Sequence, residues 1–190
     1  MYLLLLLLVA FFLISIMGVN WPLKLYHHYL LCKLADALGV AIEKNSIFSN
    51  VYSQINTVYH GQNLKIRFVD GSVDSIKANP GLEIRVRKPG QFLMEFYHFG
   101  RNKREWGDFK RFLTGDKITD AEWFILTDNP EMATDLWREK GDPLKNLLNS
   151  HGLINQILFS KQEIIIQLRR FHSCREIVSL LDQVSKVFEP

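Results

Sequence analysis

The chain opens on an unbroken apolar stretch. Its first nineteen residues read MYLLLLLLVAFFLISIMGV, and no charged side chain occurs before Lys24. A helix needs about 20 consecutive apolar residues to cross the hydrocarbon core of a bilayer. The pattern therefore predicts a transmembrane anchor over residues 1–20. The side chains expected to anchor it are Leu5, Phe11, Phe12 and the interfacial aromatic Trp21.

A cleaved signal peptide is the competing interpretation of this stretch. Such a peptide has a positively charged start and a cleavage site with two small residues, and the segment after Ile16 reads MGVNW. We therefore expect an uncleaved anchor. Lys24, Lys33 and Lys44 follow the span and no Lys or Arg precedes it. The positive-inside rule then predicts a single-pass protein of the inner (cytoplasmic) membrane with a cytoplasmic carboxyl-terminal domain.

Helical periodicity follows the apolar stretch. Over residues 23–42, apolar positions recur at steps of three and four, which predicts a membrane-proximal amphipathic helix within residues 21–45. Pro22 suits the first turn of a helix and Gly39 suits its end.

The pattern then changes to a period of two. Apolar and charged residues alternate over 63–69 and 81–87, and a third strand is expected over 92–99. Asp70-Gly71 and Pro89-Gly90 favour turns between them. This alternation is typical of an antiparallel sheet with one solvated face.

Helices and strands mix in the second half. The expected elements are a strand at 121–127, a helix from Pro130 to about Lys140 capped by Asn129, a second helix at 144–149 after a break at 141–143, strands at 155–159 and 163–168, and a helix at 174–188 with a capping box of Ser173 and Glu176. Strands grouped apart from helices indicate an α+β fold. Residues 46–190 are expected to form one such domain, with an antiparallel sheet and several amphipathic helices.

The run LTGDKITDAEWFILTDNPEMATDLW, starting at Leu113, resembles a widespread family of uncharacterised bacterial proteins that often carry an amino-terminal membrane segment. Their shared core has a TGD, an aspartate a few residues on, a strand, and a short helix that begins near a proline. The family often has Phe-Asp after the TGD, whereas this chain has Ile118-Thr119-Asp120. The resemblance implies a fold shared by membrane-tethered proteins of unknown role, and the family has no known activity to carry over. Physically, Thr114-Gly115-Asp116 is expected to form a turn.

Composition adds few constraints. The net charge of +3 is too small to indicate nucleic acid, and Cys32 and Cys174 are expected to be free thiols. The six histidines form no HExxH pattern, and no GxSxG, Walker or GxGxxG motif occurs. His27 and His28 could contact a haem in a membrane partner, but a lone histidine is more often a surface or packing residue. We therefore expect no catalytic residue, no metal site and no cofactor.

The densest cluster of charge is interleaved with aromatic residues. Its members are Arg101, Lys103, Arg104, Trp106, Phe109, Lys110, Arg111 and Phe112. A short helix here would present an aromatic face with basic flanks, which suits either lipid headgroups or an acidic partner. The competing interpretation is a solvated segment whose aromatic side chains reach the core.

These features predict a non-catalytic, membrane-anchored accessory or scaffold subunit of a larger integral membrane complex. The expected partners are the lipid bilayer and other integral membrane proteins, without nucleic acid. The alternatives are a membrane-anchored enzyme with a dispersed active site, a ligand- or lipid-binding domain, and an exported protein.

Overall fold

The structure is a computed structural model. It describes residues 2–17, 21–43, 53–69, 81–88, 90–98, 109–150, 152–169, 171 and 173–188. The helices in these ranges are α1 (Tyr2–Met17), α2 (Trp21–Leu38), α3 (Lys117–Glu122), α4 (Pro130–Ser150) and α5 (Cys174–Phe188). The strands are β1 (Gln54–Tyr59), β2 (Gln62–Val69), β3 (Gly81–Val86), β4 (Met94–His98), β5 (Lys110–Phe112), β6 (Trp123–Thr127), β7 (Ile154–Phe159) and β8 (Ile164–Leu168).

All the described strands belong to one antiparallel sheet. Its order is β1-β2-β3-β8-β7-β4-β6-β5, so the β7–β8 hairpin lies between β3 and β4. Long-range pairing therefore places segments from the two halves of the chain side by side. The α+β class and the antiparallel sheet predicted from the sequence are confirmed.

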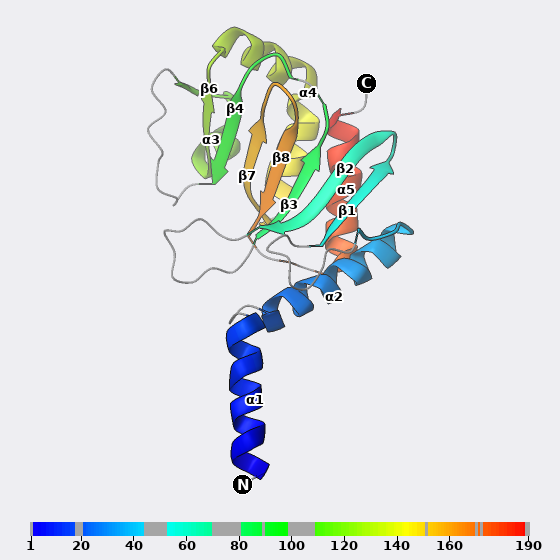
Figure 1. The fold of residues 1–190 in the computed structure, drawn as a ribbon. Coiled ribbons are helices and arrows are strands. Elements are labelled where there is room, and N and C mark those ends of the chain that lie inside the picture. The colour runs from blue at the N-terminus through cyan, green and yellow to red at the C-terminus, as the bar shows by residue number, and fades with distance from the viewer. Residues whose placement is uncertain are drawn as a thin grey trace.

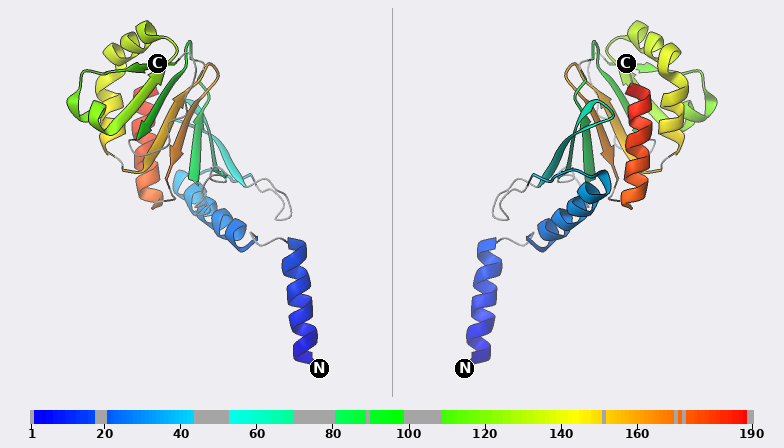
Figure 2. Two further views of the ribbon diagram at one scale, coloured as in Figure 1. Left: turned by 90° about the vertical axis from the view of Figure 1, so that its left-hand side faces the viewer. Right: turned by 90° about the vertical axis from the view of Figure 1, so that its right-hand side faces the viewer.

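One face of the sheet carries the hydrophobic core. A row of buried side chains crosses it from strand to strand: Ile55, Ile66, Ile84, Ile166, Ile157, Phe96, Ile125 and Phe112. Helices α4 and α5 cover this face (Figures 1 and 2). The α5 helix contributes Ile177, Leu180, Leu181 and Val184 to the core, while α2 packs against α5 and β1 with Leu31 and Leu34. In the described residues no helix lies on the opposite face, which we call the open face (Figure 2).

The predicted transmembrane anchor is wrong. The α1 helix has 16 residues, and no helix in the described part of the chain is both long and apolar enough to cross a bilayer. In the described residues, α1 covers Tyr2–Met17 and α2 begins at Trp21. This finding does not support the predicted single-pass location in the inner membrane. Figure 1 shows α1 pointing away from the sheet, and Leu5, Phe11 and Phe12 are 62%, 71% and 65% exposed.

Several local predictions are confirmed. Gly39 follows α2 with a φ of +68°, a conformation that favours glycine at the end of a helix. The α5 helix has its capping box: the Ser173 amide donates to Glu176 Oε2 at 3.1 Å, and the Glu176 amide donates to Ser173 Oγ at 3.3 Å. Asn129 caps α4 by accepting from the Met132 amide at 3.2 Å.

Other elements differ from the predictions. The break at 141–143 does not end a helix, because α4 runs through Pro143 and changes direction along its length (Figure 1). A proline inside a helix removes one hydrogen bond and bends the helix without ending it when packing holds both sides. Buried Leu144 and Leu147 supply that packing on the far side. Sequence reasoning also missed β1, β5 and α3.

Candidate functional site

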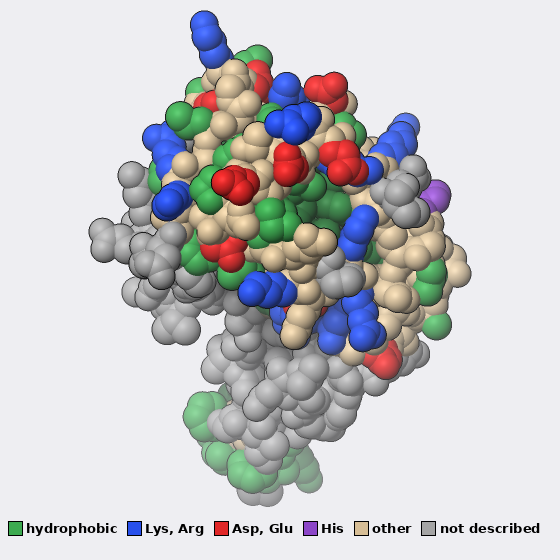
Figure 3. Space-filling model, turned by 90° about the horizontal axis from the view of Figure 1, so that it is seen from above, with side chains coloured by type: hydrophobic (Ala, Val, Ile, Leu, Met, Phe, Trp, Pro, Cys, Tyr) green, Lys and Arg blue, Asp and Glu red, His purple; other side chains and the backbone are tan. Residues whose placement is uncertain are grey.

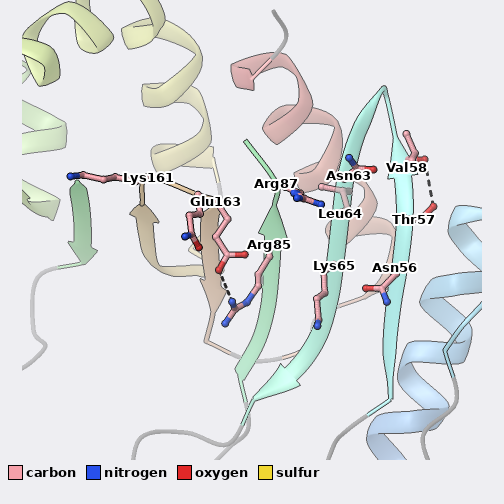
Figure 4. Close-up of a pocket in the computed structure, with 11 residues that line it drawn as sticks. Asn56, Thr57, Val58, Asn63, Leu64, Lys65, Arg85, Arg87, Lys161 and Glu163 are labelled. Carbon is pink, nitrogen blue, oxygen red and sulfur yellow. Dashed lines mark hydrogen bonds and ion pairs between the residues drawn. The ribbon is translucent and has the colours of Figure 1, made fainter. Parts of the chain in front are cut away.

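A groove opens on the open face of the sheet. It has a volume of about 1000 Å³ and lies over β1, β2, β3 and the β7–β8 turn (Figure 4). Its lining residues are Asn56, Thr57, Val58, Asn63, Leu64, Lys65, Arg85, Arg87, Lys161, Gln162 and Glu163. Four of these are basic and one is acidic. On the face seen from above, basic and acidic side chains are interspersed (Figure 3).

Strand register brings the groove residues together. Asn56 on β1 pairs with Lys65 on β2, and Lys65 pairs with Arg85 on β3. Side chains of paired residues lie on the same face, so these three form one row on the open face. Two residues further along, the Arg87 amide donates to the Asn63 carbonyl at 3.0 Å, which starts a second row.

An ion-pair network holds Arg85 in place. Its Nε donates to Glu83 Oε1 at 2.6 Å, and its Nη1 donates to Glu163 Oε1 at 2.5 Å. Arg67 Nε also donates to Glu83 Oε1, at 2.8 Å. Glu83 is only 4% exposed. Burial acts to raise the pKa of Glu83, but the hydrogen bonds from Arg85 and Arg67 outweigh it and hold that pKa below its ordinary value.

The three other basic side chains of the groove, in contrast to Arg85, have no acidic partner in the described residues. Lys65, Arg87 and Lys161 make no side-chain hydrogen bond or ion pair with any residue in the described ranges. Lys65 is half-buried, while Arg87 and Lys161 are exposed. The groove therefore combines one fixed guanidinium with three cations that solvent or a ligand must satisfy.

The predicted contact cluster is divided by the structure. Arg101, Lys103, Arg104 and Trp106 lie outside the described residues. The helix considered for this segment is wrong over Lys110–Phe112, which form strand β5. Phe112 packs into the core, and the Arg111 guanidinium lies 5.1 Å from the centre of the Phe124 ring. Their edge of the sheet is opposite the groove.

Sequence reasoning missed the groove. The signal was the alternation itself, since Lys65 and Arg67 on one strand and Arg85 and Arg87 on the next all occupy the predicted solvated face. The sequence does not predict the pairing of β3 with β8. This pairing brings Glu163 and Lys161 beside the basic residues of β3. Trp21, the remaining predicted anchor residue, is the first residue of α2.

The histidines and cysteines near α2 have structural contacts. His27 is buried and stacks on Phe68, with ring centroids 4.1 Å apart. The His28 ring lies between two side chains, with Nδ1 2.9 Å from Ser53 Oγ and Nε2 3.6 Å from Cys32 Sγ. Cys32 and Cys174 are both free thiols. The described residues contain no group of three or more ligands suited to a metal ion.

The TGD segment forms the expected turn. Gly115 has a φ of +78°, and Asp120 Oδ1 accepts from the Thr114 amide at 2.9 Å and from the Thr114 hydroxyl at 2.8 Å. The Thr119 hydroxyl donates to Asp116 Oδ2 at 2.7 Å and thereby lowers the pKa of Asp116. These bonds explain the motif as local turn chemistry that leads into α3 and β6.

Comparison with known proteins yields a likeness of fold. No protein-family model matches the chain, and no curated protein matches its sequence. The crystal structure of the mycobacterial trehalose monomycolate transport factor A, TtfA, is similar, with a TM-score of 0.58 and 8% sequence identity. The match covers 83% of this chain and 91% of that chain. The chain thus has a fold similar to that of a transport factor over most of its length.

Proposed function

We propose that this protein is a non-catalytic accessory factor of a larger protein assembly, and that it binds through the open face of its sheet. The observation that carries the proposal is the open face itself. An eight-stranded sheet in the described residues has helices on one side only, and the other side presents a groove of about 1000 Å³. Concave surfaces with a few convergent polar groups are the usual places for binding.

The fold likeness supports an accessory role over an enzymatic one. TtfA is named a transport factor, and the likeness extends over 83% of this chain. A likeness of fold is only an analogy for function. The analogy suggests the class of role that we propose, and the groove supplies the proposed binding site. On this basis, we propose that the protein serves a transport assembly whose subunits contact the open face.

Site-specific photo-crosslinking tests this proposal. A photoreactive amino acid at Asn56, which is exposed on the open face, is expected to crosslink the full chain to a small, reproducible set of transport subunits in intact cells. The matched control is the same amino acid at Lys186, an exposed position on α5. Crosslinks to the same proteins from both positions, or none from Asn56, would contradict binding through the open face.

A further inference from the structure

The groove differs from the rest of the open face because its cations outnumber the acids that neutralise them. Arg67 and Arg85 both bond to Glu83, and Arg85 also bonds to Glu163. No such partner exists in the described residues for Lys65, Arg87 and Lys161. Cations gathered without internal partners raise the local positive potential and attract anions.

The spacing of these cations suits more than one anionic group. Lys65 is next to Arg85 across the β2–β3 pair, and Arg87 lies two residues beyond Arg85. Since a strand rises about 3.4 Å per residue, the two rows are separated by about 7 Å. Figure 4 shows Lys161 on the other side of Glu163, well away from Lys65. One small anion cannot reach all three cations.

Of the six uncharged lining residues, Val58 and Leu64 are apolar and the other four are polar. Asn63 and Gln162 offer amides. The Asn56 amide nitrogen donates to Glu43 Oε2 at 2.5 Å and the Thr57 hydroxyl donates to the Val58 carbonyl at 3.5 Å, so these two residues offer mainly their oxygen atoms as acceptors. Amides both donate and accept hydrogen bonds, which suits a ligand body rich in hydroxyl groups. A groove of about 1000 Å³ is also at the upper end of the range for small-molecule sites.

We propose that the groove binds a polyhydroxylated polyanion, a sugar- or inositol-like body that carries two or more phosphate groups. Lys65, Arg87 and Lys161 pair with the phosphates. Glu83 and Glu163 fix the orientation of the Arg85 guanidinium through its Nε and Nη1, so that its remaining N–H groups donate to the ligand. This inference rests on the proposed function, because it names the ligand class for the same open face. The phosphates belong either to a free solute or to a lipid headgroup.

Isothermal titration calorimetry on the full chain in a neutral detergent tests the ligand class. The probe is myo-inositol hexakisphosphate, and myo-inositol is the uncharged control. We expect binding of the phosphorylated probe alone, weakening as sodium chloride rises from about 50 to about 200 mM because salt screens exposed charges. Equal binding of both compounds, or no binding of the probe, would overturn the proposal.

Charge-neutralising variants locate the site. Lys65→Gln and Arg87→Gln are each expected to weaken binding about tenfold, the effect of losing one charge-assisted hydrogen bond. Lys117→Gln is the matched control, because it removes one exposed positive charge on α3, which packs against β6 near the opposite edge of the sheet. Circular dichroism confirms that each variant is folded. An equal loss in all three variants would mean non-specific attraction and would overturn the site.

Two further sets of binding measurements distinguish a lipid headgroup from a free solute as the source of the phosphates. They also distinguish this inference from the proposed accessory function. Binding to phosphatidylcholine vesicles that contain phosphatidic acid, but not to vesicles without it, would indicate a lipid headgroup. Binding of inorganic pyrophosphate would indicate a free solute. In either case, Lys65→Gln must weaken the binding that is observed. An acidic peptide that competes equally well with the probe would overturn the polyhydroxylated ligand. Crosslinking from Asn56 with no binding of the probe would leave the accessory role standing and remove only this inference.

Discussion

At the scale of single residues, the open face is organised around one buried acid. Glu83 occupies a position that the strand alternation assigns to solvent, yet it is only 4% exposed. Two guanidinium groups on adjacent positions, Arg67 and Arg85, make this burial tolerable. A buried charge without partners would be strongly destabilising. The network therefore stabilises the sheet and also orients the groove guanidinium.

Replacing Glu83 with Gln is expected to lower the free energy of unfolding by about 2 kcal/mol at neutral pH, because the carboxylate loses charge-assisted hydrogen bonds in a buried place. Urea unfolding of the two proteins measures this difference. Glu131→Gln, at an exposed position in the first turn of α4, is the control and is expected to change stability far less. An equal effect in both variants would contradict the role of the network.

The same network predicts a dependence on pH. The pKa of Glu83 is lower in the folded chain than its ordinary value, so its contribution is complete above the ordinary carboxyl pKa of about 4.3. The contribution is lost as pH falls through the lowered pKa. The stability difference between the wild type and Glu83→Gln should therefore shrink in acid below about pH 4, and a constant difference down to about pH 2 would disprove the assignment.

At the scale of elements, the β1–β2 hairpin is tied to the last helix of the described chain. The hairpin turns at His60 and Gly61, which have φ of +47° and +75°. Tyr59 donates its hydroxyl to Asp182 Oδ1 at 2.6 Å, and Gln62 Nε2 donates to the Ser185 carbonyl at 3.2 Å. These contacts fix the edge of the sheet that supplies Asn56 to the groove.

Burial, together with the hydrogen bond and charge of Asp182, raises the pKa of Tyr59 to about 12. A group whose pKa is raised on folding contributes stability below its ordinary pKa and loses it as pH rises through the folded value. Tyr59→Phe should therefore cost about 1 kcal/mol at neutral pH, and the cost should disappear in strong alkali. Ultraviolet titration of tyrosinate should show one late-ionising tyrosine near pH 12 that is missing in Tyr59→Phe.

The control for this titration is Asp182→Asn. It removes the negative charge and leaves the tyrosine in place, so the late ionisation should move toward the ordinary range without disappearing. A late tyrosine that persists unchanged in Asp182→Asn would assign the shift to burial alone.

At the scale of the whole molecule, α1 does not take part in the hydrophobic core that the sheet forms with α2, α4 and α5 in the described residues. The core cluster of the described residues begins at Leu31 and includes no residue of α1. The α1 side chains from Leu4 to Val9 are 52–69% exposed. An exposed apolar surface of this extent promotes association. The core, in contrast, takes side chains from α2, α4, α5 and every strand.

A chain that lacks residues 1–20 is therefore expected to keep its cooperative thermal unfolding, with a midpoint within about 3 °C of the full chain, because little core surface is lost. It should also remain monomeric in analytical ultracentrifugation at concentrations where the full chain self-associates. Removing residues 174–188 is the contrasting deletion and should abolish folding, because α5 contributes Leu180, Leu181 and Val184 to the core. Loss of folding in the first deletion would contradict this division.

The sequence by itself determined most of the local structure. Periods of two and of three to four residues identified β2, β3, β7, β8, α2 and α5, because in these elements one face is buried and the other is solvated. Capping chemistry located the start of α5 at Ser173 and Glu176, since those bonds form between neighbours in the chain. Helix α4 was divided wrongly at Pro143 because packing from distant residues holds both parts together.

Only the tertiary structure decided where the groove forms and which side chains line it. The pairing of β3 with β8 joins residues about 80 positions apart, and it places Glu163 and Lys161 beside Arg85. No local pattern encodes such a pairing, because it depends on how the whole sheet closes its core.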